Sequence, residues 1–207
     1  PFYPLRGHAY CQNNGPYCQT TTLVQNVTQI ADHRRLRLAS NYAIEARLNG
    51  GLGERKTGSQ AAPLAGRFKI GHVLTDSWGS AFKGDFAELR VYNRALMDAE
   101  RVIIQNHLAA RYGVTLDEGD VYAGKGAAAG DYDLDVVGIG CTTAAGTYDA
   151  PGAVVRSESS AGLTLEALGG SLDEDGEYLL AGHKAAANGW VYSGGAQTGV
   201  SRRWQRE

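Results

Sequence analysis

The chain lacks a strong charge of either sign and any long apolar run. Its 207 residues contain 20 Lys and Arg against 22 Asp and Glu, which gives a net charge of -2 at pH 7. A nucleic-acid backbone is bound through a surplus of lysine and arginine, so this balance argues against nucleic acid as a partner. No apolar stretch approaches the roughly 20 residues that cross a bilayer as a helix, and we therefore expect no membrane span.

Cysteine is scarce, with only three residues. None has the CxxC or CxxCH spacing, which argues against a zinc ribbon and a c-type haem. Cys11 and Cys18 bracket the turn-rich sequence NNGPY, so a disulfide between them is one interpretation, as an exported protein would permit. Two unpaired thiols are the other. Cys141 stands alone beside Ile139 and Gly140, which is typical of a small buried residue in a strand.

Common catalytic signatures are also missing. The five histidines are scattered without HExxH or His-x-His spacing, and no serine lies in a GxSxG elbow. These patterns argue against metal-dependent hydrolases and against serine hydrolases.

Glycine, in contrast, is abundant, with 28 residues. Many glycines suit many tight turns between short strands, which favours an all-β fold. Polar and apolar residues alternate over 34–38 and 41–49, as in half-buried antiparallel strands. The side chains expected to face the core are Tyr42, Ile44, Ala46 and Leu48. The sequence Asn-Gly-Gly at 49–51 predicts a hairpin turn.

Residues 97–112 form the one clear helical pattern. Its apolar stripe is expected at Met97, Ile104, Leu108 and Tyr112. Two carboxylates in the first turn complement the helix dipole, and Gly113 is placed to end the helix in the left-handed conformation. A strand over residues 82–93 is expected directly before this helix.

The composition changes near residues 116–119, which predicts a domain boundary. An irregular segment of residues 1–20 precedes a first β-domain over 21–116, and a second β-rich domain covers 119–207. Further strands are expected at 66–73, 134–140, 153–158, 163–168, 177–181, 189–192 and 200–205.

The sequence over residues 83–114, KGDFAELRVYNRALMDAERVIIQNHLAARYGV, resembles the closing strand and helix of concanavalin A-like, laminin-G-type modules of bacterial surface and secreted proteins. The stretches AIEARLNG at 43–50 and RFKIG at 67–71 share this resemblance. It covers roughly residues 21–114 and implies the C-terminal portion of an antiparallel jelly-roll sandwich, whose earlier strands are missing or supplied elsewhere. The motifs DVVGIG at 135–140, YLLAGH at 178–183 and RRW at 202–204 resemble an uncharacterised β-rich domain that often accompanies such modules.

Two positions depart from the resemblance. Calcium-associated modules of this kind often carry an aspartate where this chain has Ala87, and losing a charged oxygen ligand weakens a calcium site. The helix cap is commonly Ser or Thr, whereas Met97 cannot accept the amide hydrogen bonds, which costs about 1 kcal/mol. Asp98 offers an alternative cap one residue later.

Two acidic clusters are candidate metal sites, with a structural calcium ion as the possible cofactor. Asp131, Asp133 and Asp135 alternate along one face of an expected strand, which suits catalysis or metal binding, or a solvated strand end. Asp173 and Asp175 surround a glycine in a sequence that resembles part of a calcium loop, and a hairpin turn explains the same pattern.

A sugar site is the remaining candidate. Trp78 lies in a Gly/Ser-rich loop with Asp76 beside it, and a flat indole ring stacks well against a pyranose. The alternative is that Trp78 folds back as a lid on the core.

The sequence thus leads to three functional hypotheses for a chain processed from a larger extracellular or cell-surface protein. The first is a non-catalytic adhesion or matrix module that binds a glycan or a surface protein through loops at the rim of the sandwich. The second is a structural subunit or spacer that strands from neighbouring copies, or from another segment of the precursor, complete. The third is an accessory module of a glycan-degrading enzyme.

Overall fold

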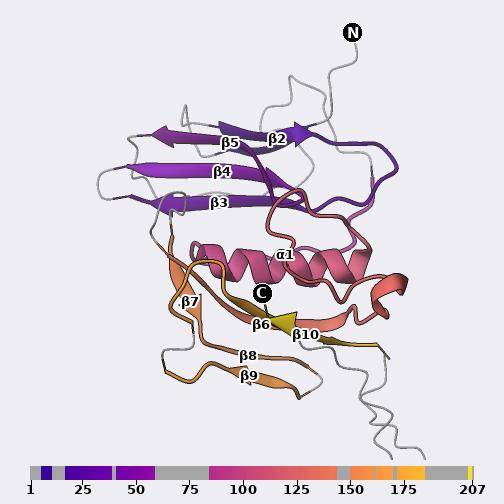
Figure 1. The fold of residues 1–207 in the computed structure, drawn as a ribbon. Coiled ribbons are helices and arrows are strands. Elements are labelled where there is room, and N and C mark those ends of the chain that lie inside the picture. The colour runs from indigo at the N-terminus through magenta and orange to yellow at the C-terminus, as the bar shows by residue number, and fades with distance from the viewer. Residues whose placement is uncertain are drawn as a thin grey trace, which may run out of the picture.

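A computed structural model describes residues 6–10, 17–38, 41–58, 84–143, 150–160, 162–169, 172–184 and 205–206. These residues form short antiparallel strands around the long helix α1 (Figure 1). The expected β-rich class is therefore confirmed.

The first large sheet has the order β3-β4-β5, with β3 at Ala31–Arg37, β4 at Tyr42–Leu48 and β5 at Gly51–Gly58. All neighbours are antiparallel, and Arg34 on β3 lies opposite Glu45 on β4. The predicted hairpin turn joins β4 to β5. Asn49 and Gly50 both take positive φ, 48° and 86°, as this turn requires.

Strand β4 is buried on both faces, which differs from the expected alternation. Ala43, Ile44, Glu45 and Ala46 are all buried in succession. The hairpin of β1 (Arg6–Tyr10) and β2 (Tyr17–Thr22) packs against β4 and β5. A strand covered on both faces has no solvated side, so even a charged residue such as Glu45 is directed into the interior.

Helix α1 covers Asp98–Tyr112, as predicted, and Gly113 ends it with φ 64°. The Met97 side chain makes no capping hydrogen bond, in agreement with its chemistry. Instead, the carboxylate of Glu100 accepts a hydrogen bond from the Met97 N–H at 2.8 Å. This contact is half of a capping box and satisfies one of the amides that a helix start leaves open.

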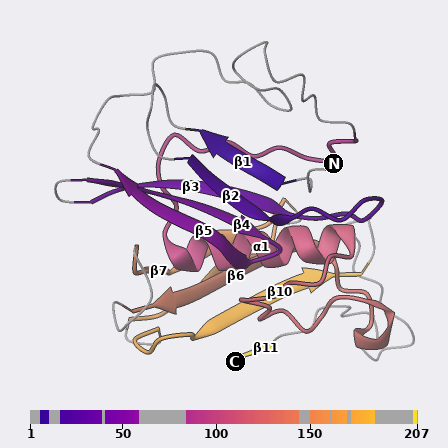
Figure 2. The same ribbon diagram turned by 90° about the horizontal axis from the view of Figure 1, so that it is seen from above.

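The predicted apolar stripe of α1 is half-buried, and other residues are buried more deeply, because the helix lies between two sheets (Figures 1 and 2). The buried helix residues combine small, apolar, polar and charged side chains: Asp98, Ala99, Arg101, Ile103, Gln105, Asn106, Ala109 and Ala110. A single-stripe helix covers one sheet, whereas this helix needs separate surfaces for two.

The second large sheet has the order β11-β10-β6-β7. Its strands are β6 (Leu134–Thr142), β7 (Gly152–Val154), β10 (Tyr178–His183) and β11 (Gln205–Arg206). A short 3-10 helix, η2 (Ala127–Ala129), precedes β6, and a separate hairpin pairs β8 (Arg156–Glu158) with β9 (Thr164–Glu166).

One buried cluster joins α1 to this second sheet. Ala99 and Ile103 of the helix pack with Val136 of β6 and Leu180 of β10, and Tyr122 completes the group. Residues on both sides of 116–119 therefore share a core. The division into two domains at that point stays a prediction.

The strand expected over residues 82–93 is wrong for its described part, because residues 84–96 belong to no strand. The strands expected at 66–73 and 189–192, and nearly all of the one at 200–205, lie outside the described residues. The stretch before α1 is consequently a connection that runs over the surface, and its path defines the candidate site.

Candidate functional site

Residues 85–94, the tethered segment, are held along α1 by a contact near each end. The Tyr112 hydroxyl donates to Oε2 of Glu88 at 2.9 Å, and Nη1 of Arg111 lies 3.6 Å from the same oxygen. Near the other end, Arg94 donates two hydrogen bonds of 2.6 Å to Glu100. Because Glu88 lies at the end of α1 and Arg94 at its start, the segment runs antiparallel to the helix.

The spacing of these two contacts shows that the segment is extended. Helix α1 rises about 18 Å between Glu100 and Tyr112 at 1.5 Å per residue. The six steps from Glu88 to Arg94 cover roughly 20 Å when extended and far less when coiled. The segment therefore has the conformation of a β-strand, and Figure 2 shows its trace crossing the molecule along α1.

The apolar side chains of the tethered segment face solvent. The exposed fractions are 58% for Phe86, 56% for Leu89 and 67% for Val91. Within the described part of the chain, no backbone–backbone hydrogen bond involves residues 87–92. An extended apolar stretch with unpaired main-chain groups is the type of surface to which another strand adds.

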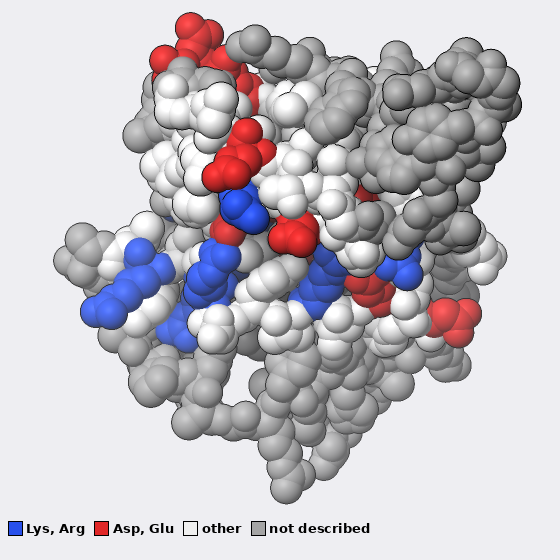
Figure 3. All heavy atoms as spheres, turned by 90° about the horizontal axis from the view of Figure 1, so that it is seen from below, with Lys and Arg blue, Asp and Glu red and all other residues white. Residues whose placement is uncertain are grey.

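Charge on the tethered segment is balanced within it. The guanidinium of Arg90 donates a 2.5 Å hydrogen bond to Glu88 and lowers the pKa of that carboxyl. The bond from Tyr112 acts in the same direction, while Glu88 raises the pKa of the Tyr112 hydroxyl. Glu88 is thus a carboxylate at neutral pH. Seen from below, acidic and basic side chains are interspersed over the described surface rather than gathered by sign (Figure 3).

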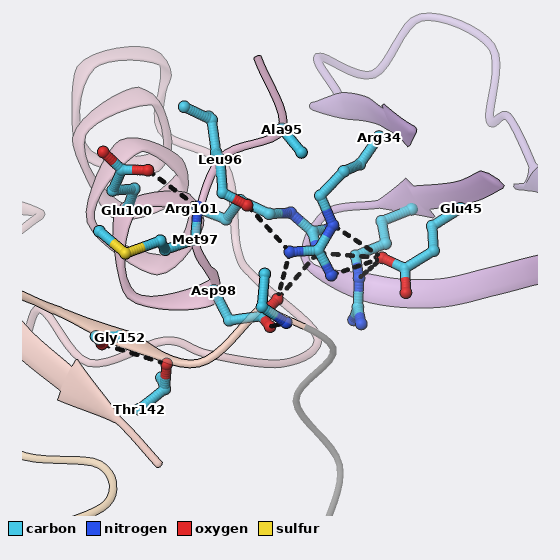
Figure 4. Close-up of polar contacts among 12 residues, drawn as sticks. Arg34, Glu45, Ala95, Leu96, Met97, Asp98, Glu100, Arg101, Thr142 and Gly152 are labelled. Carbon is cyan, nitrogen blue, oxygen red and sulfur yellow. Dashed lines mark hydrogen bonds and ion pairs between the residues drawn. The ribbon is translucent and has the colours of Figure 1, made fainter. Parts of the chain in front are cut away.

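Four buried side chains, the buried charge cluster, fix α1 against the first sheet: Arg34, Glu45, Asp98 and Arg101. Nη2 of Arg34 lies 2.9 Å from Glu45, and its Nη1 lies 2.7 Å from Asp98. Nη1 of Arg101 lies 3.2 Å from Glu45 and 3.3 Å from Asp98. Figure 4 shows the two cations alternating with the two anions. All four side chains are 7% exposed or less, so each charge depends on the others.

Further partners surround this cluster. Asp32 lies 2.7 Å from Nη2 of Arg101 and also accepts a 3.1 Å hydrogen bond from Gln105. Nη1 of Arg34 donates to the carbonyl oxygen of Leu96 at 3.1 Å. This bond fixes the chain two residues after the tethered segment to the first sheet. The cluster thereby sets the position of the segment as well as that of α1.

The middle of α1 is fixed to the loop that follows the helix by a neutral side chain. Asn106, which is fully buried, donates to the carbonyl oxygens of Val102 at 2.8 Å and Gly119 at 2.6 Å. Its Oδ1 accepts from the amides of Val121 at 3.1 Å and Tyr122 at 3.0 Å. The Asn106 side chain thus provides hydrogen-bond partners for main-chain N–H and C=O groups of this loop that would otherwise be buried without any.

Two histidines lie near the start of β6. Nε2 of His183 lies 2.9 Å from Oδ2 of Asp135, and this hydrogen bond lowers the pKa of Asp135. Burial lowers the pKa of His107, whose Nδ1 lies 2.9 Å from the carbonyl oxygen of Val136. A neutral His107 then donates from Nδ1, and its buried Nε2 has no hydrogen-bond partner. Both side chains hold β6 in place.

The first acidic cluster does not form the expected alternating row. Strand β6 begins at Leu134, and Asp131 and Asp135 have positive φ values of 55° and 47°. The backbone therefore turns at both residues, and Asp135 is bonded to His183 instead of aligning with Asp133. Alternation in sequence places side chains on one face only when the backbone is a regular strand.

The second acidic cluster surrounds a turn. Asp175 accepts a hydrogen bond from the Thr143 amide at 2.8 Å, and Gly176 has φ 81°. The amide of Asp173 donates to Glu177 at 3.1 Å. These contacts form a turn, as the alternative predicted, but the turn connects β9 to β10, which do not pair with each other, so it is not a hairpin. Calcium binding at either cluster stays a prediction.

The other predicted site residues are not covered. Trp78 and Asp76 lie outside the described residues, and so does Cys11. Cys18 belongs to β2, but its side chain is not described. The sugar site and the disulfide stay predictions. Cys141 is a free, buried thiol in β6, as expected, and burial raises its pKa.

The described residues contain no group of three or more His, Cys, Asp or Glu side chains placed to hold a metal ion. Among their helices, none has the length and apolar character to cross a membrane. Comparison of the chain with protein families, curated proteins and solved structures finds no match.

Proposed function

We propose that this chain is a non-catalytic interaction module that joins another polypeptide by β-strand addition at the tethered segment. The observation that carries this proposal is an extended stretch with exposed Leu89 and Val91 and no described strand partner. Its N–H and C=O groups have the spacing that an added strand needs. Main-chain hydrogen bonds then supply affinity, and the alternating side chains supply specificity.

The resemblance to laminin-G-type modules supports the same function. It implies a strand at residues 82–93 inside a jelly-roll sandwich, and within the described residues the main chain of 87–92 makes no strand hydrogen bond. We propose that a strand from outside the described fold completes the sandwich. The chain would then be a structural or adhesive part of an extracellular assembly.

The platform under the tethered segment also favours strand addition. A free strand loses conformational entropy when it pairs, at a cost of about 1 to 2 kcal/mol per residue. Glu88 and Arg94 hold the segment extended on α1, and the buried charge cluster holds α1 on the first sheet. Much of that entropy is lost when the chain itself folds, so less is lost on binding.

Overlapping synthetic peptides that tile the 207-residue sequence test this function. Their binding to the folded chain is measured by fluorescence anisotropy. We expect at least one peptide of alternating apolar pattern to bind, with protection of the amides of residues 87–92 from hydrogen exchange.

Two leucine variants locate the binding surface. We expect Leu89→Lys to weaken peptide binding roughly tenfold, because a charge replaces an apolar cross-strand contact. Leu168, which is 81% exposed, provides the matched control, and Leu168→Lys should bind peptide like the original chain. The proposed function is wrong if no peptide binds, or if Leu89→Lys binds as tightly as Leu168→Lys.

A further inference from the structure

We infer that the strand added to the tethered segment is the same segment of a second copy of this chain, paired antiparallel about a two-fold axis at Leu89. This inference rests on the proposed strand addition and names its partner. In such a pair, Leu89 faces Leu89 of the second copy, and positions at equal distances on either side of it face one another. The contact is isologous, so it closes as a dimer.

The charged face of this pair is complementary. Glu88 faces Arg90 of the second copy, and Arg90 faces Glu88, so the two-fold axis generates two opposite-charge pairs. Cross-strand pairs of opposite charge stabilise antiparallel strands. Glu88 and Arg90 already lie 2.5 Å apart within one copy, so the dimer alternates two acids with two bases.

The opposite face is complementary as well. Its centre consists of Leu89 facing Leu89, with Ala87 facing Val91 on either side. Asp85 faces the neutral Asn93 at the two ends, so no like charges meet. Leu89 and Val91 are 56% and 67% exposed in the single chain, and pairing removes part of this apolar surface from water.

The charge pattern selects this register over its neighbours. A pair centred on Glu88 places two carboxylates opposite each other, and a pair centred on Arg90 places two guanidinium groups opposite each other. Shifting one strand by one residue relative to the other places the charged Glu88 opposite the apolar Leu89. Like charges that face each other directly destabilise a strand pair, so the register centred on Leu89 is favoured over those centred on Glu88 and Arg90.

The size of the contact predicts a weak dimer. One pair of short strands buries less surface than the total of roughly 1,600 Å² found in standard stable interfaces. We therefore expect association that depends on concentration, with a shift in sedimentation from the 22.0 kDa monomer towards twice that mass. Lysine at position 89 should remove this shift, and the Leu168→Lys control should retain it.

Disulfide trapping of full-length chains reads the register directly. Facing residues of an antiparallel pair have Cα atoms about 5 Å apart, which a disulfide spans. Leu89→Cys should therefore form a covalent dimer under mild oxidation. Two copies of position 87 lie about 13 Å apart along the strands in this register, so Ala87→Cys should stay monomeric. The unsubstituted chain controls for its own three cysteines.

Charge reversal gives an independent test. Glu88→Arg faces only basic side chains across its own dimer, and Arg90→Glu faces only acidic ones, so each variant alone should lose the dimer. Mixed in equal amounts, the two variants restore opposite charges at every facing pair and should form a heterodimer. Circular dichroism checks that both are folded, since Glu88 also binds Tyr112. If Glu88→Arg does not fold, disulfide trapping with Leu89→Cys and Ala87→Cys still tests the register.

The outcomes separate this inference from the function that it rests on. A covalent Leu89→Cys dimer together with a monomeric Ala87→Cys supports it, as does recovery of dimer in the charge-reversal mixture. It is overturned if the chain is monomeric at every concentration, or if both cysteine variants cross-link equally. Should a peptide other than residues 85–93 bind the monomer, strand addition stands and self-pairing falls. If no peptide binds and no dimer forms, both are wrong.

Discussion

Nη1 of Arg101 lies 3.2 Å from Oε2 of Glu45, and this contact joins the centre of the first sheet to the helix that carries the tethered segment. Both side chains are 5% exposed or less. Two charges so far from water are stable only when paired, and here Arg34 and Asp98 complete a ring of alternating sign. The ring therefore fixes the register of α1 on the sheet.

Replacing Arg101 by methionine should destabilise the chain strongly. The methionine side chain retains most of the apolar stem but leaves three carboxylates around the site with fewer counter-charges. We expect the free energy of unfolding to fall by about 3 to 5 kcal/mol. Urea denaturation followed by circular dichroism measures this loss.

Arg156→Met is the matched control. Arg156 forms a 3.3 Å pair with Glu166 on the surface, so replacing it should cost less than about 1 kcal/mol. Equal losses would contradict a buried role for Arg101.

Replacing Asn106 should loosen the loop that follows α1. Asn106→Leu keeps a similar volume but removes four hydrogen bonds, and it leaves the buried Tyr122 amide without a partner. We expect a loss of about 3 kcal/mol, because each buried open group costs about 1 to 3 kcal/mol. Asn41→Leu on the exposed surface is the control. In Asn106→Leu the Val121 and Tyr122 amides should exchange their hydrogens faster. An unchanged exchange rate would contradict the role of the Asn106 hydrogen bonds in holding this loop.

Glycine is required where β6 passes beneath other side chains. A Cβ atom at Gly140 would collide with the ring of Tyr178, and one at Gly138 would lie 2.9 Å from Leu180. Gly140→Ala should therefore cost about 1 to 3 kcal/mol through overpacking. Gly169 is the matched control, because an added Cβ there meets nothing within 4 Å. Thermal unfolding of the two alanine variants makes the comparison, and a similar Tm for both would contradict it.

The sequence predicts the elements of this fold better than it predicts their surroundings. The helix, its glycine end and the Asn49-Gly50 hairpin follow from local rules, and the structure contains all three. Local rules act through capping, backbone sterics and side-chain spacing, which depend on near neighbours only.

Burial is where the sequence misleads, because it depends on distant parts of the chain. On β4, Glu45 and the residues on its face alternate with apolar residues, a pattern that indicates a solvated face. In the structure α1 covers that face. The tethered segment gives the reverse case: alternation in DFAELRVY predicts a paired strand, yet residues 87–92 make no main-chain hydrogen bond within the described part of the chain. Periodicity reports which residues share a face but not whether that face is covered. The candidate site could therefore be located as a strand, and only the structure shows it exposed.

Acid should weaken the fold in two separate ranges of pH. Burial lowers the pKa of His107 below its ordinary 6.5, so the unfolded chain takes up a proton there before the folded chain does. The free energy of unfolding should therefore fall as the pH drops from about 6.5 towards the folded pKa of His107. Above pH 6.5 the full contribution of the neutral ring to stability is present. The hydrogen bond from His183 lowers the pKa of Asp135 below 3.8, so stability is lost again as the pH falls below that value.

Two histidine variants assign these ranges. In urea titrations across the pH scale, His107→Gln should flatten the upper range, because glutamine takes up no proton there, and leave the lower one in place. His183→Gln should reduce the lower range instead, since it weakens the bond that holds Asp135 ionised. The two variants contain the same change at sites that differ in what they contact, so each controls for the other. If His107→Gln kept the full slope below pH 6.5, the buried, neutral state of that ring would be wrong.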